Sequence, residues 1–177
     1  MQARALSQLE QLKITGENRA LVISATGTGK TILSALAAKQ FSPSRVLFIA
    51  HREQILRKAA EEFQRVFQAP AKDFGFFVGK DKDTEPRFIF SSIQSLSKTE
   101  NLNKFSPTDF DFVIVDEVHR GIAKTYETVL DHFKPKFLLG LTATPERTDG
   151  KDIFRIFDYN VACLLYTSDA ADDSLRV

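Results

Sequence analysis

The chain contains no tryptophan, only one cysteine and no long hydrophobic run. The single cysteine, Cys163, allows neither an internal disulfide nor a zinc cluster. The longest apolar runs, such as 20–23 and 46–50, have the length of strands and are too short to cross a bilayer. No apolar signal-peptide core follows the first residues. These absences lead us to expect a cytoplasmic protein that does not interact with membranes.

An excess of charge of either sign is also lacking, with 24 Lys and Arg against 23 Asp and Glu. This balance still permits nucleic-acid binding, because a local basic strip is sufficient for it. The 177 residues, 43% of them hydrophobic, are enough for one domain with a substantial core. Most of the 16 phenylalanines lie in apolar runs, and we expect them inside.

Apolar runs of strand length alternate with helical stretches along the chain. Expected strands are 20–24, 45–50, 74–78, 87–91, 112–115 and 136–141, and expected helices are 3–14, 32–40, 53–67 and 126–133. This alternation predicts an α/β domain with a mostly parallel central sheet flanked by helices. Polar motifs follow the ends of several strands, which is where open α/β sheets bind ligands.

A glycine-rich loop, Ser-Ala-Thr-Gly-Thr-Gly-Lys-Thr at 24–31, separates the first strand from a helix. This strand–loop–helix context is the one in which backbone N–H groups and a helix N-terminus bind phosphate. Lys30 supplies a charge for the β and γ phosphates of ATP, and the Thr31 hydroxyl can ligate Mg²⁺. Ser24 stands where the usual motif has glycine. The predicted nucleotide-binding residues are Thr26, Gly27, Thr28, Gly29, Lys30 and Thr31.

Two adjacent carboxylates, Asp116 and Glu117, follow the strand expected at 112–115. Asp116 is suited to hold the Mg²⁺ shell, and Glu117 to polarise the attacking water. Activation of water indicates hydrolysis of the nucleotide and disfavours a kinase. With Lys30, these carboxylates are the predicted catalytic residues.

The acidic pair continues as Asp-Glu-Val-His at 116–119, and Thr-Ala-Thr follows at 142–144. In this order the motifs resemble those of superfamily 2 helicases of the DEAD/DEAH type, although Ala is commoner than Val before the histidine. The resemblance implies the first RecA-like domain of a P-loop NTPase motor. It also implies that His119 takes part in catalysis and communicates with Thr142 and Thr144 to couple hydrolysis to movement.

Further segments resemble the same family. By this resemblance Gln2 reads the adenine base. The segments 48–54 and 90–96 resemble loops that grip the backbone of DNA or RNA, which makes Arg52, Ser92 and Gln94 candidate nucleic-acid contacts. Ser92 replaces the usual threonine. The alternative interpretation for Arg52 and Ser92 is that each caps a helix.

The run 140–150 resembles a bacterial branch related to restriction-enzyme motor subunits, some of which carry a phospholipase-D-like nuclease region. We expect residues 1–162 to be the ATP-binding domain, separated from a second RecA-like domain of the parent protein. Residues 163–177 resemble the translation of a sequencing adapter, and we expect them to be disordered or only loosely attached. Because the second domain supplies arginine fingers in this family, the fragment alone should be nearly inactive.

Two alternatives remain open within the same fold. One is a restriction-complex motor that moves along duplex DNA without separating the strands. The other is a nucleotide-dependent binding module without motor activity.

Overall fold

The computed structural model describes residues 2–24, 29–117, 124–143, 155–158 and 160–164. The α-helices are α1 (Gln2–Ile14), α2 (Lys30–Phe41), α3 (Glu53–Phe67), α4 (Ile93–Leu96), α5 (Thr99–Leu102) and α6 (Lys124–His132), and η1 (Ala71–Asp73) is a 3-10 turn. The strands are β1 (Arg19–Ser24), β2 (Val46–Ala50), β3 (Phe74–Val78), β4 (Asp81–Lys82), β5 (Phe88–Ser92), β6 (Phe112–Asp116), β7 (Phe137–Thr142) and β8 (Val161–Leu164).

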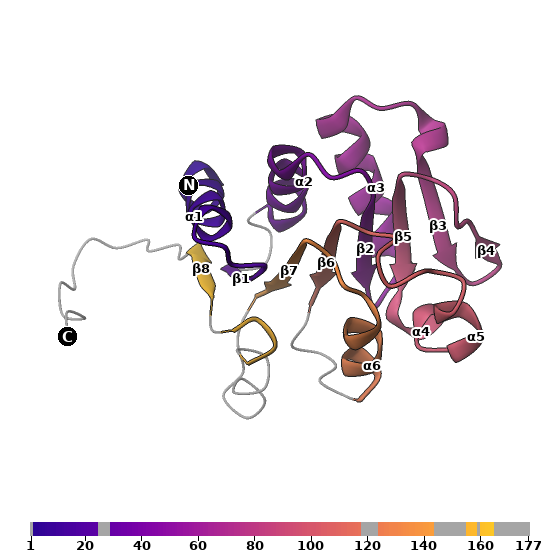
Figure 1. Ribbon diagram of the computed structural model, residues 1–177. Coiled ribbons are helices and arrows are strands. Elements are labelled where there is room, and N and C mark those ends of the chain that lie inside the picture. The colour runs from indigo at the N-terminus through magenta and orange to yellow at the C-terminus, as the bar shows by residue number, and fades with distance from the viewer. Residues whose placement is uncertain (1, 25–28, 118–123, 144–154, 159, 165–177) are drawn as a thin grey trace.

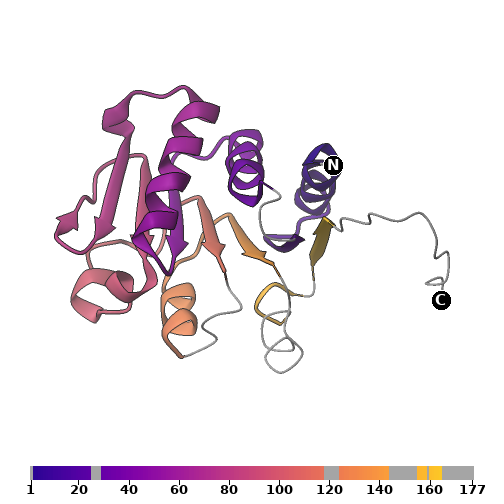
Figure 2. The same cartoon turned by 180° about the vertical axis from the view of Figure 1, so that it is seen from behind.

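All of these strands belong to one sheet, in the order β4-β3-β5-β2-β6-β7-β1-β8. Every pairing is parallel except that of β3 with the two-residue strand β4. Helices cover both faces of the sheet, which gives three layers (Figures 1 and 2). The predicted α/β fold with a mostly parallel sheet is therefore confirmed.

Successive residues of the central strands pack against opposite layers, as the pleat requires. In β2, Phe48 packs in the buried cluster under α1, α2 and α3, whereas Leu47 and Ile49 pack in the cluster under α4, α5 and α6. The central strands are consequently apolar at both odd and even positions, which explains their unbroken hydrophobic runs.

Phenylalanine rings join α3 to the sheet. Phe63 of α3 meets Phe48, Phe88 and Phe90 edge-on, at centroid distances of 5.9, 6.2 and 5.6 Å. This is a favourable geometry for aromatic pairs. The four rings are buried, so the expectation that phenylalanine forms the core is confirmed for them.

Strand β8 extends beyond residue 162, where we expected native packing to end. Its residues Cys163 and Leu164 pair in parallel with Ile23 and Ser24 of β1. Of the two expected states, disordered or loosely attached, disorder is thus wrong for these two residues. Pairing at a sheet edge uses backbone groups, which every sequence without proline provides. The adapter origin of 163–177 stays a prediction, and 165–177 lie outside the described residues.

Gly140 of β7 leaves no room for a side chain, because a Cβ atom there would overlap ring carbons of the fully buried Phe157. We expect Gly140→Ala to lower the free energy of unfolding by about 1–3 kcal/mol, measured by urea denaturation. Phe157→Ala alone should cost about 3–5 kcal/mol, because it leaves a cavity.

The double variant is the control. Its free energy of unfolding should fall by clearly less than the sum of the two single decreases, because the Phe157 ring that the new methyl group would meet is gone. Strictly additive losses would show that the Phe157 ring moves aside.

Candidate nucleotide and nucleic-acid site

The candidate site lies along the edge where the parallel strands end. Register pairs place Asp116 beside Leu141, Ile23 beside Thr142, and Ala50 beside Ser92. The ends of β1, β2, β5, β6 and β7 therefore share one edge of the sheet. This is the edge at which open α/β sheets bind ligands.

Gly29 precedes α2 with φ 80° and ψ 29°, a left-handed conformation that glycine adopts without strain. It allows the chain to turn directly into the helix, so that Lys30 and Thr31 occupy the first turn of α2. Lys30 Nζ donates a hydrogen bond to the carbonyl oxygen of Ser24, at 3.1 Å. This bond joins the first residue of α2 to the last residue of β1. Thr26, Gly27 and Thr28 lie outside the described residues.

Asp116 is the last residue of β6 and is only 6% exposed. Its Oδ1 accepts a hydrogen bond from the backbone N–H of Glu117, at 2.9 Å. Burial raises the pKa of Asp116 to about 6, an effect that this hydrogen bond and the charge of Lys30 reduce and the charge of Glu117 increases. The carboxylate therefore lies within electrostatic range of the Lys30 ammonium group.

Glu117 has φ 55°, in the left-handed region that residues other than glycine seldom adopt. Such strain is typical of functional positions. Thr142 ends β7 and is fully buried. His119 and Thr144 lie outside the described residues, so their predicted coupling with Thr142 stays a prediction.

A cleft of about 450 Å³ lies at this edge and brings the candidate catalytic residues together. Its lining residues are Gly29, Lys30, Thr31, Ile32, Ile55, Lys58, Glu62, Asp116 and Glu117. The volume suits a small-molecule ligand, since such pockets measure roughly 300–1,000 Å³. Gln2 is the first residue of α1, and its predicted contact with adenine stays a prediction.

The acidic groups in this cleft fit magnesium held together with a nucleotide. No group of three or more potential ligands from His, Cys, Asp and Glu occurs among the described residues. Mg²⁺ does not need such a cage, because it commonly binds through one or two carboxylates, phosphate oxygens and water. Thr31 and Asp116, both in the cleft lining, are the residues suited to hold it.

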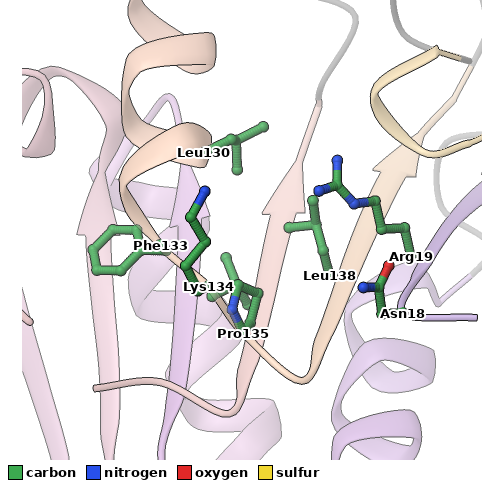
Figure 3. Close-up of a pocket in the computed structure, with 8 residues that line it drawn as sticks. Asn18, Arg19, Leu130, Phe133, Lys134, Pro135 and Leu138 are labelled. Atoms are coloured by element: carbon green, nitrogen blue, oxygen red, sulfur yellow. The ribbon is translucent and has the colours of Figure 1, made fainter. Parts of the chain in front are cut away.

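A second hollow, of about 150 Å³, lies toward the opposite ends of the strands. Asn18, Arg19 and Leu138 line one side and Leu130, Phe133 and Lys134 the other (Figure 3). It is smaller than an ordinary ligand pocket. The guanidinium group of Arg19 already has partners within the chain. It donates a hydrogen bond to the Ile156 carbonyl oxygen at 3.0 Å, and its Nε lies 3.7 Å from Oδ2 of Asp158. We assign the hollow no ligand.

The candidate nucleic-acid residues follow β2 and β5 at the same edge as the cleft. Arg52 is exposed, and although it precedes α3 its side chain makes no capping hydrogen bond. Gln94 is exposed, and its Nε2 lies 2.7 Å from Nδ1 of His51. Ser92 is buried, and its hydroxyl accepts from the backbone N–H of Ser95 and so caps α4. The capping alternative is therefore confirmed for Ser92, and its contact with nucleic acid stays a prediction.

Residues 1–147 match the protein family described as "Type III restriction enzyme, res subunit". The chain belongs to this family. Its fold and family make it the first RecA-like domain of a superfamily 2 helicase or translocase.

Two similar proteins are much longer than this chain. The chain is 30% identical over 159 residues to the type I restriction enzyme EcoAI endonuclease subunit of Escherichia coli, a match that covers 83% of this chain and 19% of that protein. It is 27% identical over 135 residues to the DNA 3'-5' translocase XPB2 of Sulfurisphaera tokodaii, and this match covers 76% of this chain and 29% of that protein. The chain thus spans less than a third of these curated relatives.

Among solved structures, the fold is similar to that of the Hef helicase domain of Pyrococcus furiosus, with a TM-score of 0.74 and 19% identity. The match covers 90% of this chain and 37% of that one. This similarity confirms the RecA-like fold. No described helix of this res-subunit family member is long and apolar enough to cross a membrane. The cytoplasmic location stays a prediction.

Several residues of the site were not predicted from the sequence. Lys58 and Glu62 line the cleft from α3, and His51 contacts Gln94. His51 could have been found, because it directly precedes Arg52 in the same motif. Lys58 and Glu62 carry no comparable signal, because charged residues on the polar side of an amphipathic helix are ordinary.

The raised pKa of Asp116 makes stability depend on pH in a defined direction. The folded protein holds this proton more tightly than the unfolded chain, so the stability that Asp116 contributes is fully present below pH 3.8 and is lost as the pH rises through about 6. In metal-free protein with a chelator, we expect Asp116→Asn to become more stable than wild type over this window, by roughly 2–3 kcal/mol. Urea unfolding at a series of pH values measures the difference.

Asp111 provides a control of opposite sign. A hydrogen bond from Lys136, at 2.8 Å, and another from the backbone N–H of Ser44 hold the pKa of Asp111 below its usual value. Stability from Asp111 is therefore present above the unfolded pKa and lost toward acid pH. Asp111→Asn should be the less stable protein near neutral pH. A pH-independent difference between Asp116→Asn and wild type would contradict the account of Asp116.

Proposed function

We propose that this chain is the ATP- and Mg²⁺-binding domain of a motor that couples ATP hydrolysis to movement on nucleic acid. The observation that carries the proposal is the cleft that gathers Lys30, Thr31, Asp116 and Glu117. A cationic side chain at a helix N-terminus faces a buried carboxylate across this cleft, as a magnesium-bound triphosphate requires.

Each residue has a distinct task in this proposal. The N-terminus of α2 and the glycine-rich loop hold the phosphates, and Lys30 neutralises charge on the β and γ groups. Thr31 and Asp116 would hold the magnesium shell, and the bound ion would neutralise phosphate charge. Glu117 orients and polarises the water that attacks the γ-phosphate. Gln2 recognises the adenine base.

Transfer of the hydrolysis signal is assigned to His119, Thr142 and Thr144. Support comes from the neighbouring positions of β6 and β7, since Asp116 pairs with Leu141 directly before Thr142. A shift of Asp116 and Glu117 would therefore also displace the residues at the end of β7.

Nucleic acid is the proposed partner of the edge formed by β2 and β5. Arg52 and Gln94 are exposed there and can contact a sugar-phosphate backbone. Ser92 would act with them through the N–H groups at the start of α4. The relatives are named for work on either nucleic acid, since one is a DNA translocase and another a putative RNA helicase, and the proposed partner is therefore DNA or RNA.

A second RecA-like domain of the same parent protein completes the motor in this proposal. Arginine fingers from that domain would stabilise the charge that develops on the γ-phosphate, an effect of about 10³–10⁵ in rate. The 177-residue chain alone should therefore bind ATP weakly and hydrolyse it slowly. A phospholipase-D-like nuclease region of the parent remains part of the proposal by resemblance only.

Substitutions of Lys30 and Glu117 test the proposed chemistry in a protein that joins this chain to the second RecA-like domain of its parent. Lys30→Ala should weaken ATP binding and abolish most turnover, because the phosphate charge loses its counter-ion. Glu117→Gln should still bind ATP but lose turnover, because the amide cannot polarise water. Steady-state phosphate release and nucleotide titration measure the two effects.

Lys39→Ala, at the C-terminal end of the same helix, is the matched control and should keep wild-type turnover. Wild-type turnover in Lys30→Ala or Glu117→Gln would refute the catalytic assignment. Turnover that nucleic acid does not stimulate would favour a nucleotide-dependent binding module. Translocation without strand displacement would favour the duplex-tracking motor.

Arg52→Ala tests the nucleic-acid edge in the same two-domain protein. It should weaken binding of single-stranded DNA, because one phosphate contact is lost. For the same reason, the slope of log Kd against log salt concentration should fall by about one. ATP affinity without DNA should not change. Arg65→Ala, which removes the same charge from the last turn of α3, is the control and should bind DNA like wild type. Equal losses in both variants would mean that only overall charge matters.

A further inference from the structure

Two lysines meet over one buried aromatic ring at the β4 end of the sheet. Nζ of Lys82, in β4, lies 4.6 Å from the centre of the Phe77 ring. Nζ of Lys104, two residues after α5, lies 5.8 Å from the same centre. Both lysines are exposed, whereas Phe77 is fully buried. The two ammonium groups therefore belong to one surface patch, which we call the lysine pair.

Backbone pairing and aromatic packing fix the lysine pair from two separate segments. Lys82 lies opposite Phe77 in the antiparallel pairing of β3 with β4. Phe105 follows Lys104 directly, is buried, and meets Phe77 edge-on at a centroid distance of 5.1 Å. Figures 1 and 2 both show α5 next to the β3–β4 end of the sheet. The two charges are thus held near each other by the fold and do not depend on a flexible loop.

The nearest negative charge of the β3–β4 hairpin lies on the other face of the sheet. Asp81 precedes Lys82 in β4, and successive strand residues point to opposite faces. Its Oδ2 lies 3.3 Å from Nη2 of Arg57 in α3. Neither Lys82 nor Lys104 forms an ion pair with a carboxylate in the part of the chain that the structure describes. Two neighbouring positive charges repel each other, and a bound anion would remove this repulsion.

The lysine pair lies close to the edge that carries Arg52 and Gln94. Lys82 is paired with Phe77, and Phe77 with Ser91, the residue before the end of β5. In the strand order, β3 and β5 separate β4 from β2. The three strand spacings between β4 and β2 amount to about 14 Å. Since one strand of a duplex carries a phosphate about every 3.4 Å, a backbone that crosses the ends of β2 and β5 reaches the pair within a few nucleotides.

We propose that Lys82 and Lys104 bind phosphates of a nucleic-acid strand that crosses the ends of β2 and β5 and continues past β3 and β4. The inference rests on the proposed function, because Arg52 and Gln94 hold the same strand. The lysine pair lies outside the segments 48–54 and 90–96 and adds two phosphate contacts to theirs. Such contacts position the backbone and carry no sequence preference. They extend the bound length of nucleic acid and take no part in the chemistry of the nucleotide cleft.

The experiment compares Lys82→Gln/Lys104→Gln with wild type in the protein that joins this chain to the second RecA-like domain. The probes are single-stranded DNA and RNA of about 20 nucleotides. At about 0.1 M salt the Kd of the variant should rise roughly 10- to 30-fold, and the slope of log Kd against log salt concentration should fall by about 1.4, because two phosphate contacts are lost. ATP turnover without nucleic acid should be unchanged. The concentration of nucleic acid that gives half-maximal stimulation should rise by the same factor as the Kd, with the same maximal turnover.

Lys13→Gln/Lys72→Gln is the matched control. Both residues are exposed and precede β1 and β3, so they lie toward the opposite edge of the sheet. Lys13 also covers a ring, with its Nζ 4.6 Å from the centre of Phe41. This control removes the same charge and should bind nucleic acid like wild type.

Three results would count against the inference. Equal losses of affinity in the two double variants would show that only overall charge matters. An unchanged salt slope in Lys82→Gln/Lys104→Gln, with Arg52→Ala still weakened, would mean that the lysine pair only covers Phe77. Either result would overturn this inference alone. Failure of the wild-type two-domain protein to bind either probe would overturn the proposed function and this inference with it.

Discussion

Burial of the central strands on both faces is the constraint on which the rest of the structure depends. Every residue of β2, β5, β6 and β7 is buried, so these strands tolerate few polar groups along their length. The polar residues of these strands are confined to their carboxyl ends, at Ser91, Ser92, Asp116 and Thr142. Since these strands run parallel, their carboxyl ends form one continuous edge. The position of the candidate site follows from the layered packing.

Asp116 is a charged residue at the end of an otherwise apolar buried strand. A carboxylate at the last buried position of β6 is costly to ionise, which is why its pKa is raised to about 6. A divalent cation and its bound phosphates would remove this cost, because a bound cation is the largest local charge in such a site. The left-handed backbone of Glu117 adds strain at the next residue. A bound magnesium nucleotide would therefore offset the cost of ionising Asp116.

The sequence predicted the elements whose signal is strong within a single segment. Helix 53–67 was predicted with its observed bounds, because its apolar period continues over four turns. Strands β4 and β8 and helices α4 and α5 were not predicted, since two to four residues carry too little periodicity and depend on partners distant in sequence. Ser92 shows a different limit, because a hydroxyl after a strand suits a helix cap and a phosphate contact equally.

Helix α3 gives the domain a physical connection between its two candidate sites. Arg52 lies directly before its first turn at the nucleic-acid edge, and Ile55, Lys58 and Glu62 line the nucleotide cleft. Phe63 anchors the helix to β2 and β5, so α3 and the ends of these strands form one packed unit. A contact at Arg52 that shifts this unit would reshape one wall of the cleft. Because such coupling is reciprocal, nucleotide in the cleft would change the affinity for nucleic acid by the same factor. A motor that moves on nucleic acid needs this reciprocity, because it must bind and release the nucleic acid alternately.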